Sequence, residues 1–473
     1  MERKWKILII SGGVLIFVLF SLFLFMSGCA SHKTKVEKAV PNQNVEKTIP
    51  NQKIRKADSN QKMGKTALDQ NVEKAVLDQK WEEVYNLLKS DDSSELSAVD
   101  RFLLAYACKK TNRLNEVSKL SDSVKVKEKN DLINLREWTS ALVSKNPDNP
   151  VARNLLGCVY YILGEYDIAI ENFNQAIKID LNYADAYNNR GGAYDDKGQY
   201  NRAIEDFNKA IKINPQDAEA YYNRGNAYVH KGQYDRAIED FNKAIKINPQ
   251  DAEAYYNRGN AYVHKGQYDR AIEDFNKAIK IDPQDAKAYN NRGLAYNNKG
   301  QYDRAIKDFN KAININPQDA KAYYNRGNAY FNKGQYDRAI EDFNKAIKIN
   351  PQDAEAYYNR GNAYVHKGQY DRAIEDYNKA IKINPKYAEA YYNCGNAYVH
   401  KGQYDRAIED YTKAIQINSQ YAKAYSNRGG AYYHKRQYSK ARRDWEKVVQ
   451  LDPNGTVGQN ARNGLEILRQ KGY

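Results

Sequence analysis

A glycine recurs every 34 residues through most of this 473-residue chain, and this period constrains the fold more than any other feature. The nine glycines are Gly157, Gly191, Gly225, Gly259, Gly293, Gly327, Gly361, Gly395 and Gly429. A fixed period of this length indicates one supersecondary unit copied many times. Because each copy buries its apolar face against its neighbours, one architecture can extend over a length that would otherwise suggest about three domains.

Each repeat has the pattern of two helices separated by a tight turn. In residues 218–251, Tyr221 and Gly225 lie four residues apart, as do Ala237 and Phe241, and this is the spacing of one helix face. A glycine follows the first helical segment and a proline follows the second, so each segment has a stop signal. We therefore predict an all-α fold.

The repeat resembles the tetratricopeptide repeat, whose glycine, tyrosine, alanine, phenylalanine and proline positions recur here in phase. The resemblance covers residues 150–455 in nine copies and implies a right-handed superhelical solenoid of helix-turn-helix repeats. One departure recurs, because arginine replaces the family's leucine before the glycine in all copies except those with Leu156 and Cys394. We predict that these arginines have a structural role and bind Asp240 and its equivalents.

The flanks of the repeats are also helical in pattern. Val457, Ala461, Leu465 and Leu468 share one helix face, which predicts a capping helix after the last repeat. The predicted organisation is a signal or anchor segment at 1–28, a tether at 29–80, an irregular helical region of degenerate repeats at 81–149, nine repeats at 150–455, and a capping helix at 456–473.

The amino terminus has the pattern of an export signal. Basic residues precede an apolar run from Ile7 to Met26. The stretch from Met26 to Cys29 resembles the lipobox of bacterial lipoproteins, which implies lipidation of Cys29 and removal of residues 1–28. The alternative is an uncleaved transmembrane anchor, because a run of 20 residues is also long enough to span a membrane. Both interpretations place the repeats on the non-cytoplasmic side of a bacterial envelope membrane, in the periplasm or at the cell surface.

A nine-residue repeat fills the predicted tether between residues 36 and 80. Its five copies align lysine in one column and glutamine in another. Pro41 and Pro50 favour an extended chain in the early copies, whereas the later copies lack proline and are compatible with helix. We interpret the segment as a spacer between the membrane and the repeats.

Charge and motifs exclude several classes of function. The chain has a net charge of +15, but residues 1–80 carry 14 Lys and Arg against 7 Asp and Glu, and residues 422–473 carry 11 against 4. The repeats between these ends are nearly neutral, which argues against nucleic acid as a partner. The sequence contains no nucleophile elbow, phosphate loop, dinucleotide fingerprint or paired CxxC motif. We predict neither an enzyme nor a cofactor or metal site.

The resemblance implies that the first helices of successive repeats line a concave groove that binds peptides. Two columns of asparagine would face it, and together we call them the asparagine ladder. The first column is Asn189, Asn223, Asn257, Asn291, Asn325, Asn359, Asn393 and Asn427, and the second is Asn226, Asn260, Asn328, Asn362 and Asn396. Each amide offers a donor and an acceptor, so the ladder can clamp a peptide backbone.

These features predict a membrane-anchored envelope scaffold that binds a protein partner or extended peptide and assists assembly of an envelope complex. Two alternatives remain open. The ladder is a merely solvated polar surface if recent duplication explains its recurrence. If it instead binds a peptide backbone, replacing Asn257, Asn291 and Asn325 by alanine should weaken binding while stability holds or rises slightly. Alternatively, the near-identical repeats associate with each other, and the chain is a structural solenoid that forms a homo-oligomer.

A histidine column adds a further set of candidates. Its members are His230, His264, His366, His400 and His434. Successive copies should lie roughly 10 Å apart, whereas ligands of one zinc ion all lie near 2 Å from it. The column therefore predicts no metal site, and surface histidine is the simpler interpretation.

Overall fold

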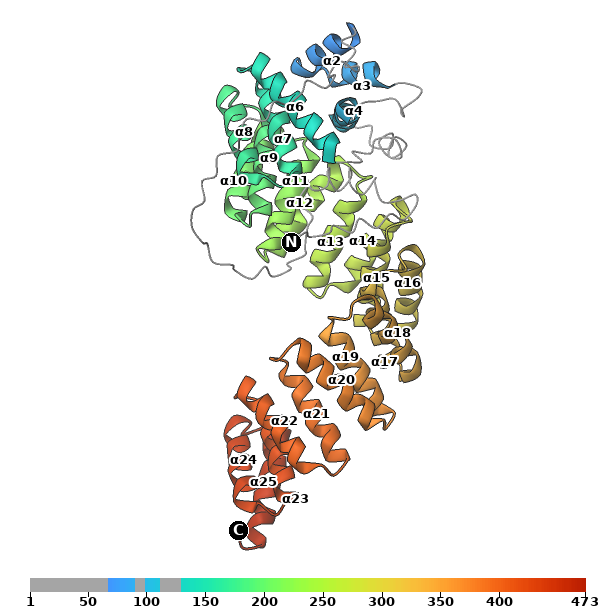
Figure 1. The fold of residues 1–473 in the computed structure, drawn as a ribbon, viewed down its shortest axis with the longest axis vertical. Coiled ribbons are helices and arrows are strands. Elements are labelled where there is room, and N and C mark those ends of the chain that lie inside the picture. Colours follow the sequence, from blue (N-terminus) through green and yellow to red (C-terminus); the bar gives the residue numbers. More distant parts are fainter. Residues whose placement is uncertain (1–66, 90–97, 111–128) are drawn as a thin grey trace, which may run out of the picture. The chain divides into compact units, whose positions relative to one another are not determined.

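The computed structural model describes most of the predicted folded part of the chain, and every regular element in it is an α-helix (Figure 1). The predicted all-α repeat fold is therefore confirmed. The described residues are 67–89, 98–110 and 129–473. The predicted signal segment, Cys29 and the first part of the tether lie outside them. Within the described ranges, no helix is both long enough and apolar enough to cross a membrane.

The chain divides into two compact units, Met1–Ala261 and Tyr262–Tyr473, and the division falls within one helix. The helices up to that point are α2 (Ala67–Leu77), α3 (Trp81–Leu88), α4 (Ala98–Lys110), α6 (Lys129–Lys145), α7 (Pro150–Ile162), α8 (Tyr166–Ile179), α9 (Ala184–Asp196), α10 (Tyr200–Ile213), α11 (Ala218–His230), α12 (Tyr234–Ile247) and α13 (Ala252–His264).

The second unit continues the same alternation of a 13-residue and a 14-residue helix. Its helices are α14 (Tyr268–Ile281), α15 (Ala286–Asn298), α16 (Tyr302–Ile315), α17 (Ala320–Asn332), α18 (Tyr336–Ile349), α19 (Ala354–His366), α20 (Tyr370–Ile383), α21 (Ala388–His400), α22 (Tyr404–Ile417), α23 (Ala422–His434), α24 (Tyr438–Leu451) and α25 (Thr456–Gln470). The final helix, α25, covers the last repeat with Ala461 and Leu468, both fully buried.

Local sequence explains where the helices begin and turn. Asp217 precedes α11, and its side chain accepts hydrogen bonds from the backbone N–H groups of Glu219 and Ala220 at 3.0 and 3.3 Å. Gly232 ends the first helix of that repeat with a φ of 69°, a conformation that favours glycine. The equivalent position in the last repeat is Arg436, which adopts a φ of 58°.

The two helices of one repeat pack closely at the periodic glycine. In α17, a Cβ atom placed on Gly327 would lie only 2.8 Å from Cε1 of Phe343 in α18. Phe343 is fully buried, together with Ala329 and Ala339 on either side of the contact. The close approach therefore requires glycine opposite an aromatic ring, which explains why the glycine recurs in every copy.

A guanidinium–carboxylate pair accompanies this contact. Arg326 donates from Nε and Nη2 to the two oxygens of Asp342 at 2.7 and 2.6 Å, and from Nη1 to Asn310 of the preceding repeat at 2.5 Å. The predicted partners are thus confirmed. The pairs seen are Arg190–Asp206, Arg224–Asp240, Arg292–Asp308, Arg326–Asp342, Arg360–Asp376 and Arg428–Asp444.

The first repeat lacks both charges of this pair. Leu156 replaces the arginine and Asn172 replaces the aspartate. Asn172 instead donates from Nδ2 to the carbonyl oxygen of Ile168 at 2.9 Å. The site therefore accepts a neutral asparagine when the arginine is absent.

The predicted boundary of the tether at residue 80 differs from the structure. The last copies of the nine-residue repeat form α2, and its Val72, Ala75 and Val76 are buried in the same apolar cluster as α3 and α7. Glu73 also pairs with Lys145 of α6 at 3.3 Å. These copies joined the folded part because, without proline, their apolar residues align on one helix face.

We expect Gly327→Ala to destabilise its repeat by about 1–2 kcal/mol, because overpacking against Phe343 outweighs the better helix propensity of alanine. Gly430→Ala is the matched control, since a Cβ there meets nothing within 4 Å, and it should stabilise by up to about 1 kcal/mol. Hydrogen exchange of α17, α18 and α23 measures both effects. Equal stabilisation by the two substitutions would contradict the close-packing explanation.

We expect Arg326→Leu to cost about 1–3 kcal/mol, because it leaves the carboxylate of Asp342 buried without its hydrogen-bond donor. Adding Asp342→Asn should recover much of the loss, since the first repeat combines leucine and asparagine at these positions. Denaturant unfolding of the single and double variants gives the coupling between the two sites. If the free-energy changes of the two single substitutions simply add in the double variant, the broken ion pair is not the source of the destabilisation.

Candidate functional site

A cavity of about 660 Å³ lies along the first helices of the last repeats in the second unit. It is bordered mainly by α19, α21 and α23, as the predicted groove requires. Its lining residues are Phe331, Asn362, Val365, His366, Tyr377, Asn393, Asn396, Ala397, Val399, His400, Tyr411, Ser426, Asn427, Gly430, Ala431 and His434. We call this cavity the amide groove, because four members of the asparagine ladder line it.

The first column of the ladder connects successive repeats in the second unit. Asn393 donates from Nδ2 to the hydroxyl of Tyr358 at 2.9 Å and to Oδ1 of Asn362 at 3.1 Å. Asn359 and Asn427 repeat this arrangement with a tyrosine and a second-column asparagine of the preceding repeat. Both N–H bonds of each amide are therefore used within the protein.

The first unit shows the same connection with deeper burial. Asn257 donates to the hydroxyl of Tyr222 at 2.8 Å and to Oδ1 of Asn226 at 3.0 Å. Asn189, Asn223 and Asn257 are each less than a tenth exposed. Where an asparagine replaces the tyrosine, its oxygen accepts instead. These bonds are Asn189 to Asn154, Asn223 to Asn188, and, in the second unit, Asn325 to Asn290.

This network corrects the expectation that the ladder contributes nothing to stability. Removal of a first-column amide leaves acceptor oxygens of the preceding repeat without their donor, which costs about 1–3 kcal/mol where they are buried. The remaining ladder members, Asn260 and Asn291, lie half-buried on α13 and α15. The ladder thus has a structural role, and its role in peptide binding stays a prediction.

Two members of the second column, Asn362 and Asn396, line the amide groove. The oxygens of Asn362 and Asn396 each accept a bond from the first column and another from Tyr377 or Tyr411, at 2.8 and 2.7 Å. Their nitrogens make only long contacts, at 3.5 and 3.4 Å, with first-column oxygens. The amide N–H groups of Asn362 and Asn396 are therefore only weakly engaged within the protein.

Sequence reasoning did not identify Tyr377 and Tyr411 as groove residues. Both stand where earlier repeats carry phenylalanine, and each keeps its ring buried while its hydroxyl reaches the ladder. The replacement of phenylalanine by tyrosine at a core position was the available signal, because a buried tyrosine hydroxyl requires a polar partner.

Three members of the histidine column, His366, His400 and His434, are exposed, as the surface interpretation predicts, and they also line the amide groove. His366, His400 and His434 stack on tyrosines of the preceding repeat, with ring centroids 4.6–4.9 Å apart and interplanar angles below 10°. Stacking fixes the orientation of each imidazole, whose nitrogens can donate or accept. The groove therefore has a row of oriented polar rings beside the second-column amides.

Two small residues hollow the groove at its last repeat. Ser426 occupies the position of Tyr392 in the preceding repeat, and Gly430 that of Asn396. A Cβ atom on Gly430 would meet nothing within 4 Å. Both substitutions are visible in the sequence, but only the structure shows that the two small residues lie side by side and leave the same part of the groove open.

A cluster of acids lies at the ends of first helices in the first unit. Tyr161 donates a hydrogen bond to Asp196, and Asp195 lies 3.1 Å from Nδ1 of His230. Burial raises the pKa of Asp196 to about 6, and the hydrogen bond with Asp195 raises the pKa of His230. Both protonated forms are favoured in the folded state, so this contribution to stability is present at acidic pH and lost as the pH rises through these pKa values.

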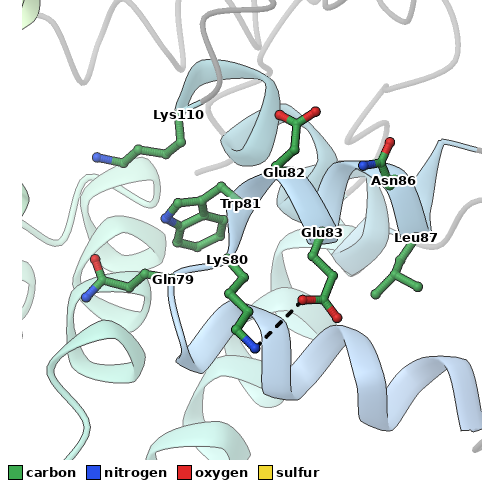
Figure 2. A pocket seen from close by; sticks show the side chains of 8 residues that line it. All are labelled: Gln79, Lys80, Trp81, Glu82, Glu83, Asn86, Leu87 and Lys110. Carbon is green, nitrogen blue, oxygen red and sulfur yellow. Dashed lines mark ion pairs between the residues drawn. The ribbon is translucent and has the colours of Figure 1, made fainter.

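A second cavity, of about 760 Å³, lies next to α3 in the first unit. Figure 2 shows its side chains, including Trp81 and the pair between Lys80 and Glu83. Trp81 is buried, with its ring centroid 4.7 Å from that of Tyr106. Lys80 and Glu83 are more than half exposed, so they offer no fixed geometry, and we take the amide groove as the candidate site. Across the described residues, no group of His, Cys, Asp and Glu is arranged to hold a metal ion.

Comparisons with known proteins agree with the repeat architecture. The sequence matches the family described as TPR repeat over 157–197, 193–232, 225–266, 259–300, 295–334, 327–368, 361–402 and 395–436. Residues 422–454 match the family described as Tetratricopeptide repeat. No curated protein matches the chain.

Solved structures that resemble the chain include YrrB, described as a TPR protein with an unusual peptide-binding site. It is 31% identical, and the match covers 40% of this chain and 96% of YrrB with a TM-score of 0.34. MamA is 34% identical over 35% of this chain and 96% of MamA, with a TM-score of 0.33. MamA from Desulfovibrio magneticus RS-1 is 26% identical over 36% of this chain and 96% of that protein, with a TM-score of 0.34. The family matches, by contrast, extend over more than half of the sequence, and the chain belongs to the tetratricopeptide repeat family.

Proposed function

We propose that this protein is a membrane-anchored scaffold of a bacterial envelope that binds an extended segment of a protein partner and so assists assembly of an envelope complex. Tetratricopeptide repeat proteins mediate protein–protein interactions, which is the coarser role that family membership supports. The finer proposal rests chiefly on one observation, the amide groove along α19, α21 and α23.

The chemistry of the groove suits an extended polypeptide. A peptide backbone presents an N–H donor and a carbonyl acceptor at each residue. The amide nitrogens of Asn362 and Asn396 can donate to its carbonyls, and the imidazoles of His366 and His400 can accept or donate. Val399 and Tyr411 add apolar contacts between these groups. No Asp, Glu, Lys or Arg lines the groove, so recognition would rest on the backbone and on shape.

The first-column amides support this proposal by ordering the groove in advance. They connect each repeat to the next through Tyr358, Tyr392 and the second-column oxygens. A site whose side chains are already held in place loses less conformational entropy on binding. The ladder would then have divided roles, in which the first column stabilises the groove and the second binds the ligand.

The proposed anchoring rests on the amino-terminal sequence. The basic residues, the apolar run and Cys29 support export and attachment to the membrane. The nine-residue repeats before α2 would then hold the folded units away from the membrane, in the periplasm or at the cell surface.

We expect the double substitution Ser426→Tyr and Gly430→Asn to weaken partner binding by about tenfold or more, or ~1.4 kcal/mol. These are the residues that the preceding repeat carries, so they fill the groove with side chains that the fold accepts. Stability should hold or rise slightly, since glycine is a poor helix former. A photo-crosslinking residue at Val399 identifies the partner in cells, and quantitative capture of that partner compares the variants.

Gly430→Ala serves as the control for the double variant, because it adds one carbon and leaves the groove open. A second crosslinker at exposed Lys413 reports contacts made outside the groove. Unchanged capture by the filled variant would refute the groove as the binding site. Crosslinks from Val399 to a second copy of this chain would instead favour the self-associating solenoid.

We expect radiolabelled palmitate to enter the wild-type protein in cells and not the Cys29→Ala variant, because the acyl chains attach at that thiol. Mass spectrometry of the mature amino terminus should show that residues 1–28 are absent. Equal labelling of both proteins, together with an intact Met1, would support the uncleaved transmembrane anchor.

A further inference from the structure

One repeat of the second unit keeps the aspartate of the guanidinium–carboxylate pair but lacks the arginine. Cys394 on α21 stands at the arginine position, and Asp410 on α22 stands at the position of its partner. The neighbouring repeats carry the full pairs Arg360–Asp376 and Arg428–Asp444. This repeat therefore lacks the donor that its neighbours supply from within the chain.

The neighbouring repeat shows what surrounds a guanidinium at this place. Arg360 donates to both oxygens of Asp376 at 2.7 and 2.5 Å and to Oδ1 of Asn344 at 2.6 Å. Its guanidinium carbon also lies 5.4 Å from the ring centroid of Tyr357. Two carboxylate oxygens, one amide oxygen and one aromatic ring thus recognise the planar cation.

The repeat with Cys394 retains all of these recognition groups. Asp410, Asn378 and Tyr391 stand at the positions of Asp376, Asn344 and Tyr357. The Oδ2 atom of Asp410 is buried and has no hydrogen-bond partner. A cysteine ends at Sγ, whereas an arginine continues from Cγ through Cδ to its guanidinium. Cys394 has only one S–H group, which bonds to Asp410, so it cannot replace the several donors of a guanidinium.

The first repeat shows that packing does not require this aspartate. There Leu156 replaces the arginine, and Asn172 replaces the aspartate and donates to a backbone carbonyl. The chain thus contains one copy that lost both charges and one that lost only the cation. A buried carboxylate oxygen without a donor, such as Oδ2 of Asp410, is costly, so the retention of this aspartate points to a cation from outside the chain.

We propose that Asp410, Asn378 and Tyr391 form a binding site for a guanidinium group, supplied by an arginine side chain of a partner protein. The bidentate fork of arginine matches the carboxylate, whereas a lysine ammonium would leave one oxygen without a donor. Solvent reaches this place, because Asp410 is only half-buried and Asn378 is exposed, whereas Asp376 of the neighbouring complete pair is buried. The site is separate from the amide groove and is tested independently of it.

The ionisation of Asp410 determines when the site is charged. Burial raises the pKa of Asp410 to about 6, and the negative charge of Glu409 on the same helix also raises it. The hydrogen bond from the Cys394 thiol acts in the opposite direction and lowers this pKa. The other titratable groups that interact with the carboxyl are Tyr391 and Tyr398 on α21 and Tyr411 on α22. Burial also raises the pKa of the Cys394 thiol, which stays protonated. Binding should therefore be present at pH 7.5 and weaken as the pH falls below about 6.

Guanidinium ion itself is the probe. Hydrogen exchange of the full chain is measured at pH 7.5 with about 10 mM guanidinium chloride, an equal concentration of sodium chloride, or an equal concentration of urea. Urea is the matched control, because it has the same planar shape without the charge. The peptide around Tyr411 and Thr412 is unique in the sequence and reports this repeat, while the peptide around Phe331 reports a repeat with its own arginine.

Guanidinium should slow exchange in α22 by the factor 1 + [L]/Kd, which is about twofold when its concentration equals Kd and larger as the site saturates. Urea and sodium chloride should not slow it, and the peptide around Phe331 on α17 should not respond. Cys394→Arg should show the slower exchange without added ion and no further response. Asp410→Asn, which copies Asn172, should fold and also lose the response. No slowing in the wild type, equal slowing by urea, or a response that persists in Asp410→Asn would overturn the proposal.

Discussion

The close approach of two helices at the periodic glycine is the contact on which the rest of this structure depends. In each repeat an aromatic ring from the second helix lies where the glycine has no side chain, as Phe343 does against Gly327. The ring can be phenylalanine, tyrosine or tryptophan, as at Tyr377 and Trp445, but the glycine does not change. Because the backbone distance is set there, alanines on both sides are fully buried and polar side chains can reach between repeats.

Two polar layers build on this apolar contact, and the departures from them point to function. The guanidinium–carboxylate pairs connect the helices of a repeat and reach the preceding one, and the first-column asparagines connect successive first helices. Where a repeat departs from the pattern, the structure has a local feature that an array of identical repeats would lack. Ser426 and Gly430 hollow the amide groove, and the replacement of arginine by Cys394 leaves Oδ2 of Asp410 without a hydrogen-bond partner. In a protein of nearly identical repeats, specificity for a partner would therefore depend on the residues that differ from the repeat pattern.

Much of the fold could be predicted because its cause is local and repeated. The spacing of Tyr221 and Gly225 indicates one helix face, because these residues lie about one helical turn apart. The recurrence of Arg224 with Asp240 indicates an ion pair, because these residues lie within one helix hairpin. The predicted start of the folded part at residue 81 was wrong, because α2 is stabilised only when α3 and α7 cover its apolar face at Val76. The stabilising role of Asn393 was also missed, because its partners Tyr358 and Asn362 lie in the preceding repeat.

The sequence by itself determined the all-α class, the 34-residue period, the capping helix and the residue types of the ladder. Each of these follows from helical periodicity and from turn residues such as Gly232, which act over a few positions. Only the tertiary structure decided which amides are used between repeats, which histidines line the groove, and where that groove is hollow. These properties depend on distances between residues 31–35 positions apart, and such distances exist only after the helices have packed.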